Sequence, residues 1–222
     1  MAGSDVFLAG ASRGVGREIA RCLVERSLPV KALLRSETAR AALEAMGIAI
    51  ALGDALNLAE VEQAMQGEPI GAVISTIGGL PQDGRRADYL GNKNLIDAAV
   101  KAGVQKFILV SSIGSGNSVV ALPPQALQAL SEVLVEKEKA EQHLIASGLT
   151  YTIIRPGGLK SEPATGNAVL TPDPTVAGSI HRADVAELVC RCLQSERVNN
   201  RVLSAVDQQM LYGQSEFERV EI

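Results

Sequence analysis

Three glycines near the start of the chain have the spacing and the surroundings of a phosphate-binding turn. Gly10, Gly14 and Gly16 lie in the segment DVFLAGASRGVGREIA, between an apolar run and an amphipathic run. Such glycines let backbone N–H groups approach a diphosphate at the positive end of a helix. This position predicts a dinucleotide site, and the alternative is a simple tight turn. The residues expected to contact the diphosphate are Gly10, Ser12, Arg13, Gly14, Val15 and Gly16.

A basic residue follows the second predicted strand, in the segment LLRSET. Arg35 and Ser36 stand where NAD-selective proteins place a carboxylate that binds the ribose hydroxyls. A carboxylate would repel a 2′-phosphate, whereas a guanidinium offers phosphate a planar fork of donors. Arg35, helped by Arg13, therefore favours NADP over NAD, and the alternative is that both arginines are only solvated. Arg40 is a further candidate, although it lies inside a predicted helix.

The third predicted strand is followed by the segment ALGDALN. Asp54 could accept a hydrogen bond from an adenine amino group while Ala55 or Leu56 packs against the ring. Aspartate before a helix is also a favoured cap, so capping is an equal alternative for Asp54. Asn57 is expected to cap the helix that follows, with Glu60 three residues later.

Small residues follow the fourth predicted strand, in the segment STIGG. Gly78 and Gly79 would allow the nicotinamide-side ribose and phosphate to approach the backbone closely. Thr76 and Ile77 precede them and complete this group of candidate contacts. A plain turn is the competing interpretation.

These candidates follow short β-like runs that alternate with helical periodicity, which is the pattern of a βα repeat. Runs such as KFILV are apolar throughout, as expected of parallel strands that are covered on both faces. The sequence therefore predicts an α/β fold with a doubly wound parallel sheet of the Rossmann type. Strands are predicted at Val6–Ala9, Val30–Leu34, Ile48–Leu52, Ala72–Thr76, Lys106–Val110, Tyr151–Ile154 and Arg201–Val206.

One domain accounts for a chain of 222 residues. We expect residues 1–206 to form an NAD(P)-binding Rossmann domain and residues 207–222 to form a C-terminal tail without an assigned structure. Helices are predicted over Pro124–Ser147 and His181–Leu193. After Pro156 the pattern loosens, and a small substrate-side elaboration is expected there.

From Asp5 to about Val206, the chain resembles the NmrA-like, NAD(P)H-binding group of atypical short-chain dehydrogenases/reductases. The glycine turn has the GxxxGxG spacing of short-chain dehydrogenases rather than GxGxxG. The segments DYLGNKNLIDAAVKAGVQKFILVSSIG and EKAEQHLIASGLTYTIIRPGGL are similar to plastid translocon-associated members of that group. More loosely, the motifs VSSIGS, EPATGNAVL and HRADVAELVCRCL resemble flavin reductase/biliverdin-IXβ reductase.

The resemblance implies a nicotinamide site built from three further segments. A serine follows the fifth strand, a lysine lies on the long helix, and an RPG turn follows the sixth strand. Ser112 and Lys139 are the implied catalytic residues, and Lys139 would hold the nicotinamide ribose. The alternative is a solvated lysine among charged neighbours that include Lys137 and Glu141. The implied contacts are Ser111, Ser112, Lys139, Pro156, Gly157 and Gly158.

The Tyr-x-x-x-Lys pair of the main family is incomplete in this chain. Val135 stands four residues before Lys139, where the tyrosine would lie. The tyrosines are Tyr89, Tyr151 and Tyr212, and none of them lies on this predicted helix. The usual proton relay to an alcohol or ketone oxygen cannot form there, so ordinary alcohol dehydrogenase activity is not expected.

The composition argues against several other classes of function. A net charge of −4 and the lack of a Lys/Arg run are unfavourable for nucleic-acid binding. No apolar stretch approaches the length of a membrane span, and Met1–Gly10 lacks the features of a secretory signal, so a cytoplasmic location is expected. No Cys/His cluster predicts a metal site. The residues expected to be core thiols are Cys22, Cys190 and Cys192.

Two functions are consistent with these features. The first is an NADPH-dependent reductase of a conjugated small molecule such as a flavin, a quinone or a linear tetrapyrrole, with the proton drawn from solvent or Ser112. The second is a non-catalytic NADP(H) sensor or tether, whose partner is another protein. An epimerase or dehydratase of nucleotide sugars ranks last, because it also needs the tyrosine and a larger substrate domain.

Overall fold

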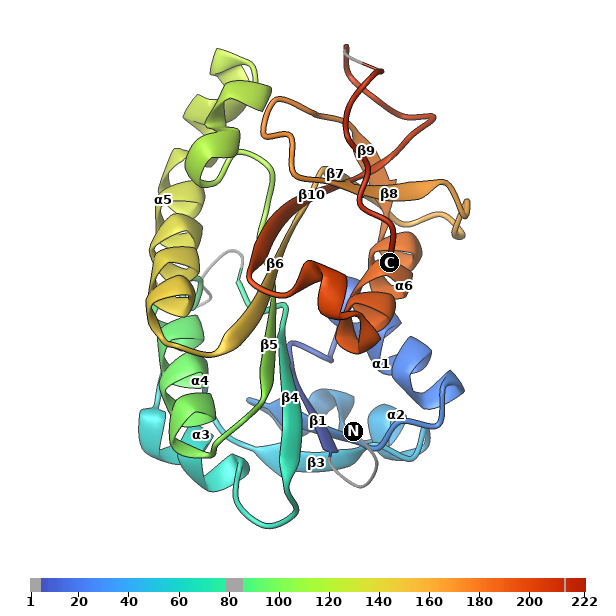
Figure 1. Cartoon of the computed structure of the whole chain (residues 1–222). Coiled ribbons are helices and arrows are strands. Elements are labelled where there is room, and N and C mark those ends of the chain that lie inside the picture. The colour runs from blue at the N-terminus through green and yellow to red at the C-terminus, as the bar shows by residue number, and fades with distance from the viewer. Residues whose placement is uncertain (1–4, 79–85, 214) are drawn as a thin grey trace.

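An eight-stranded sheet runs through the centre of the molecule (Figure 1). The structure is a computed structural model and describes residues 5–78, 86–213 and 215–222. The strands of the sheet are β1 (Asp5–Ala9), β2 (Val30–Leu34), β3 (Ala49–Leu52), β4 (Ile70–Ser75), β5 (Lys106–Val110), β6 (Thr150–Pro156), β8 (Ala168–Thr171) and β10 (Arg201–Asp207). Their order is β3-β2-β1-β4-β5-β6-β10-β8, and only the last pair is antiparallel.

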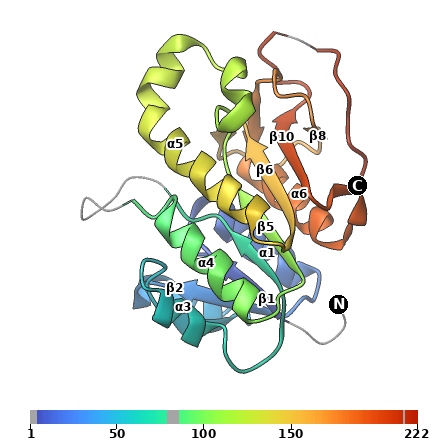
Figure 2. The ribbon, with the colours of Figure 1, turned by 60° about the vertical axis from the view of Figure 1, so that its left-hand side comes forward.

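Helices cover both faces of the sheet (Figure 2). They are α1 (Gly14–Glu25), α2 (Arg40–Glu44), α3 (Leu58–Ala64), α4 (Leu90–Lys101), α5 (Pro124–Ala146) and α6 (Arg182–Gln194). Because side chains alternate along β1, Leu8 packs with Ile19 on the face of α1, α2 and α6, while Phe7 packs with Leu95 on the face of α3, α4 and α5. The expected core thiols are buried and free: Cys22, Cys190 and Cys192. Among the described helices, none is long and apolar enough to cross a membrane.

This architecture confirms the predicted doubly wound α/β fold. Each predicted strand agrees with an observed strand to within two residues at either end. The loosened stretch after Pro156 contains three strands that the sequence did not indicate, among them the parallel pair β7 (Gly158–Lys160) and β9 (Ser179–His181). Strands of three or four residues between prolines and glycines are too short to show a period of two, so no local pattern indicates them.

The residues after β10 pack back onto the molecule. Leu211 forms a β-bridge with Gly178, and Val220 forms one with Leu170 of β8. Val220 and Ile222 also pack against the apolar cluster that contains α6. The tail therefore covers the edge of the sheet at β8, which is a position that no local pattern in the sequence indicated.

Candidate cofactor site

The segments singled out in the sequence meet at the edge of the sheet where the parallel strands end. The chain proceeds outward from β1 to β3 on one side and from β4 to β6 on the other, so the strand order reverses between β1 and β4. Open α/β sheets bind ligands in the crevice beside such a reversal. The residues that follow β1, β4, β5 and β6 therefore surround the position of a dinucleotide in this type of fold.

Two of the three glycines in the first turn are required by close packing. A β-carbon on Gly10 would lie 2.3 Å from Thr76 Oγ1, and one on Gly16 would lie 2.1 Å from the carbonyl oxygen of Gly10. Gly10 also has a φ of +97°, which other residues rarely adopt. The Thr76 hydroxyl donates to the carbonyl oxygen of Ala9 at 3.3 Å. Thr76 and these two glycines thus hold the start of α1 against the end of β4.

The third glycine opens the start of α1 to a ligand. Gly14 has a φ of +56°, and the nearest atom to a β-carbon there would be the Nε of Arg182, 3.8 Å away. No described side chain caps α1, and its first turn contains no acidic residue. The first N–H groups of a helix lack intrahelical partners and attract anions. The backbone around Gly14, Val15 and Gly16, with Ser12 and Arg13 exposed beside it, therefore fits a diphosphate group.

The basic residue after β2 is exposed at the same edge of the sheet. Arg35 and Ser36 are both exposed, and the Ser36 hydroxyl donates to Thr38 Oγ1 at 3.3 Å. Arg40, the further candidate, is engaged by acidic residues on either side of it in the chain. It forms ion pairs with Glu37 and Glu44, both at 2.8 Å, and the hydrogen bonds that it donates to these carboxylates raise the pKa of Arg40. The contact of Arg35 with a 2′-phosphate stays a prediction.

The residues after β3 form a turn with its own hydrogen bonds. The Leu56 N–H donates to Asp54 Oδ1 at 2.9 Å, so Asp54 supports the turn rather than capping α3. Asn57 caps α3, as predicted, and accepts from Ala59 N at 3.1 Å. The side-chain amide of Asn94 on α4 donates to the carbonyl oxygen of Ala55 at 2.8 Å. Asp54 remains partly exposed, and its contact with adenine stays a prediction.

A buried acid supports the turn after β4. Gly78 has a φ of +152°, and a β-carbon there would lie 2.3 Å from Asp88 Oδ1. Asp88 is fully buried and forms an ion pair with Lys137 of α5 at 3.5 Å. Ile77 precedes this turn and packs with the core on the α4 side. Gly79 lies outside the described residues.

The lysine implied by the resemblance does not reach this turn. Lys139 pairs with Glu136 at 2.6 Å and faces a surface groove on α5, together with Val135. Lys137 approaches the turn instead, and its Nζ lies 3.3 Å from the position that a β-carbon on Gly78 would occupy. Side chains two positions apart on a helix point in different directions, which explains the difference. The residue four positions before Lys137 is Val133, so the tyrosine is absent in this register too.

A buried ion pair joins α5 to β6 beside the residues that follow β5. Glu141 of α5 is 1% exposed and accepts two hydrogen bonds from Arg155, at 3.1 and 2.6 Å. The Ser111 hydroxyl also donates to Glu141. Glu141 is therefore not one of the solvated neighbours that the sequence suggested, and Arg155 is neutralised inside the protein. Ser112 is only partly buried, and its hydroxyl donates to the carbonyl oxygen of Ile113 at 2.9 Å.

The turn after β6 is held by backbone contacts. The Ile113 N–H donates to the carbonyl oxygen of Pro156 at 3.0 Å, and the Gly157 N–H donates to that of Ala205 at 2.9 Å. A β-carbon on Gly157 would lie 2.1 Å from the carbonyl oxygen of Gly178, so no other residue fits there. Gly158, the next residue, is exposed. The backbone thus places Ser112 and the turn after β6 side by side.

A buried polar cluster holds the segment that follows β7. Asp184 accepts from the N–H groups of Thr165 and Gly166 at 2.9 and 3.0 Å, and the Thr165 hydroxyl donates to Asp207. His181 Nδ1 lies 3.7 Å from Asp184. The side chains of His181, Asp184 and Asp207 are close enough to share a cation, with ligand atoms within 4.8 Å of one another. N–H and O–H donors already occupy both carboxylates, which is the pattern of a structural hub.

Four side chains at this edge are not among the predicted site residues. The sequence contains a signal for only one of them, Lys137. Leu134, Glu141 and Leu144 are buried, and Lys137 lies on the same stripe at helical spacing, so periodicity alone favours Lys137 over Lys139. The other three depend on contacts between distant segments. They are Asp88, Asn94 and Arg182.

Comparisons with known proteins agree with this geometry. Residues 10–196 match the NAD(P)H-binding family. Sanguinarine reductase of Eschscholzia californica is 32% identical, over 88% of this chain and 86% of its own length. The uncharacterized sugar epimerase YhfK of Bacillus subtilis is 34% identical, over 91% of this chain and 94% of its own. The anaerobillin reductase ChuY of Escherichia coli O157:H7 is 34% identical, with a TM-score of 0.84 over 92% of this chain and 97% of ChuY.

These similarities extend over nearly the whole of the described chain, including the turns that surround the reversal of strand order. The relatives have different names, so the shared feature is the nucleotide-binding architecture rather than one substrate. With the open start of α1 in agreement, the chain belongs to the NAD(P)H-binding family.

Proposed function

We propose that the protein is an NADPH-dependent reductase of a conjugated acceptor, such as a flavin, a quinone or a linear tetrapyrrole. The observation that carries this proposal is the make-up of α5, which presents Lys137 but no tyrosine to the carboxyl edge of the sheet. An acceptor that is reduced without a phenolic proton donor fits such a site. Two similar proteins are named as reductases, of anaerobillin and of sanguinarine, which supports the same class of reaction.

The preference for NADP rests on the residues after β2. Arg35 is exposed beside Ser36, where a carboxylate would select NAD. Arg13, exposed at the start of α1, adds a second positive charge near the glycine turn. Both guanidinium groups favour a cofactor that carries an additional phosphate.

The reaction requires positioning more than acid–base chemistry. NADPH, when bound, supplies a hydride, and a proton from water or the Ser112 hydroxyl completes the two-electron reduction of the acceptor. Lys137 would hold the nicotinamide ribose, and Pro156–Gly158 would border the ring. The segment that follows, up to Thr175, shapes the acceptor site. Correct placement of two reactants can by itself supply a large part of the rate enhancement.

Rapid-mixing measurements of NADPH oxidation test this proposal directly. Flavins, quinones and biliverdin serve as acceptors, and simple alcohols, sugars and steroids with NADP⁺ serve as the matched negative panel. We expect turnover with at least one conjugated acceptor and none with the alcohols. The Ser112→Ala variant is expected to lose only part of its rate, because water can replace the hydroxyl. Robust oxidation of an alcohol would contradict the proposal, since no tyrosine lies on α5.

A second candidate is a non-catalytic NADP(H) sensor or tether. The valines that occupy the tyrosine position in either register, Val133 and Val135, favour it, because they remove the family's proton donor. In this case NADPH binds tightly, no acceptor in the panel is reduced, and a protein partner recognises the bound state. An epimerase remains the least favoured, since it needs the same missing tyrosine.

A further inference from the structure

A guanidinium group lies where the starts of α1 and α6 meet. Arg182 is the first residue of α6, and its Nε lies 3.8 Å from the position of a β-carbon on Gly14, the first residue of α1. Its other contacts are with the segment after β6. Arg182 donates to the Ser161 hydroxyl at 2.7 Å and to the carbonyl oxygen of Leu159 at 3.4 Å. The side chain therefore bridges the glycine turn and this segment.

The electrostatic surroundings of Arg182 are unfavourable for a cation unless an anion joins it. The start of a helix carries partial positive charge, and Arg182 lies beside the start of α1. Among the described residues, no carboxylate forms an ion pair with Arg182, and its acceptors are neutral. Asp184, the acid in the first turn of α6, is directed to the buried hub with Thr165 and Gly166. Positive charge thus accumulates beside Gly14.

We propose that Arg182 binds the diphosphate of the dinucleotide and holds it against the start of α1. This inference rests on the proposed cofactor site. A guanidinium offers parallel N–H donors that match phosphate oxygens, and the exposed N–H groups at Gly14 face the same ligand. Arg182 therefore differs in role from Arg35, because the diphosphate is common to NADPH and NADH whereas the 2′-phosphate is not.

The same contacts link cofactor binding to the acceptor side. Arg182 is held by Leu159 of β7 and by Ser161, which belong to the segment that borders the proposed acceptor site. A diphosphate on Arg182 fixes this side chain and, through it, the segment. Cofactor binding is therefore expected to order the acceptor site.

Titration of NADPH and NADH into the Arg182→Met variant tests the binding role. Methionine keeps the apolar stem and removes the charge. We expect both affinities to fall by the same factor, about tenfold to a hundredfold, because one charge-assisted contact is lost. Arg182→Lys is expected to lose less, since it retains the charge. Arg191→Met on the same helix, whose guanidinium donates to the Ile222 carbonyl away from Gly14, is the matched control.

The outcomes separate this inference from the proposed function. If the unmodified protein binds neither cofactor, the proposed function fails. If it binds NADPH and Arg182→Met binds equally well, Arg182 has no role in binding and the inference is overturned. A loss for NADPH alone would also overturn it, because that pattern belongs to a 2′-phosphate contact.

Amide exchange of residues 158–161 tests the proposed link. NADPH is expected to slow exchange there in the unmodified protein and in Arg191→Met, but not in Arg182→Met at cofactor concentrations that saturate each protein. Equal protection in all three proteins would show that the segment is ordered without Arg182, which would contradict the link.

Discussion

Basic side chains concentrate around the carboxyl edge of the sheet although the chain as a whole has a net charge of −4. They come from four different elements or turns, and each has a different position relative to the proposed cofactor. Local positive potential on an acidic protein attracts an anionic ligand to one place on the surface. The residues are Arg13, Arg35, Lys137 and Arg182.

At this scale, the proposed preference for NADP depends on Arg35. We expect Arg35→Glu to reverse the preference for NADPH over NADH, with NADPH affinity falling about tenfold to a hundredfold through loss of a charge-assisted contact. Calorimetric titration with both cofactors measures this, and Arg21→Glu on the exposed face of α1 is the control. Equal affinities of the unmodified protein for the two cofactors would refute the assignment.

The two lysines of α5 offer a matched pair of variants. Lys137→Met is expected to weaken NADPH binding about tenfold, because the ammonium near the Gly78 turn is lost. Lys139→Met is expected to change it less than about twofold, because an exposed pair with Glu136 contributes little. Fluorescence titration of NADPH into both variants distinguishes them. A larger loss of affinity for Lys139→Met would identify Lys139 as the ribose-binding lysine, as the family resemblance implied.

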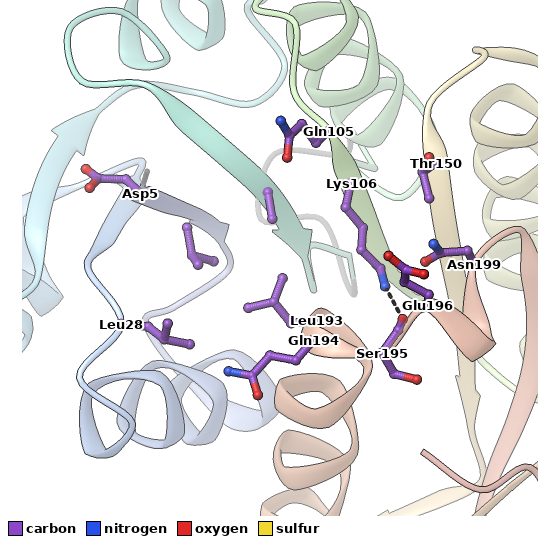
Figure 3. A pocket seen from close by; sticks show the side chains of 12 residues that line it. Asp5, Leu28, Gln105, Lys106, Thr150, Leu193, Gln194, Ser195, Glu196 and Asn199 are labelled. Carbon is purple, nitrogen blue, oxygen red and sulfur yellow. Dashed lines mark hydrogen bonds between the residues drawn. The ribbon is translucent and has the colours of Figure 1, made fainter. Parts of the chain in front are cut away.

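At the scale of elements, the far edge of the sheet shows how α6 is anchored. A cavity of about 580 Å³ opens there, among the first residues of β1, β5 and β6 and the end of α6 (Figure 3). Lys106 of β5 is 7% exposed and donates to the carbonyl oxygens of Cys192 and Ser195 at 2.7 and 2.8 Å. Carbonyls at a helix end lack intrahelical partners, so this ammonium caps α6. The cavity lies at the amino edge of the sheet, opposite the candidate cofactor site.

Replacing Lys106 should loosen α6 from the sheet. We expect Lys106→Met to lower the free energy of unfolding by about 1–3 kcal/mol, because two carbonyls lose their buried partner. Burial lowers the pKa of Lys106, so the unfolded chain binds more protons between the folded and unfolded pKa values, and stability rises with pH in that range. The difference in the free energy of unfolding between the unmodified protein and Lys106→Met should therefore widen above neutral pH.

Urea unfolding at pH 7 and at about pH 10 measures this difference. Lys101→Met, which removes an exposed ion pair with Glu62, is the control and should have little effect at either pH. A difference that narrows as the pH rises would contradict the assigned direction of the shift.

At the scale of the whole molecule, the C-terminal residues complete the sheet edge. The Val220 N–H donates to the carbonyl oxygen of Leu170 at 2.8 Å, and Val220 packs against the core. We expect Val220→Ala to lower the free energy of unfolding by about 1 kcal/mol and Tm by about 2–4 °C. Glu221→Ala, at the exposed neighbouring position, should leave Tm unchanged. Equal Tm values for the two variants, measured by calorimetry, would show that the tail does not support the edge.

The strands, the helices and the first glycine turn follow from sequence patterns that act over short distances. Apolar runs and helical periodicity specified the strands and helices, because each element must bury one or both faces. The turn at Gly10–Gly16 could be predicted from the sequence because close packing and a positive φ at Gly10 exclude larger residues. The same local motifs carried the resemblance to the NAD(P)H-binding family.

Which side chains meet at the site depends on the packing of elements that are distant in the chain. Asp88 joins Lys137 at the turn after β4, and Glu141 pairs inside the protein with Arg155 rather than with solvent. Arg182 joins the glycine turn from a position far along the chain. Such contacts depend on how helices rotate and pack against the sheet, which local periodicity does not specify. They are set by long-range packing, so they become visible only when distant elements are brought together.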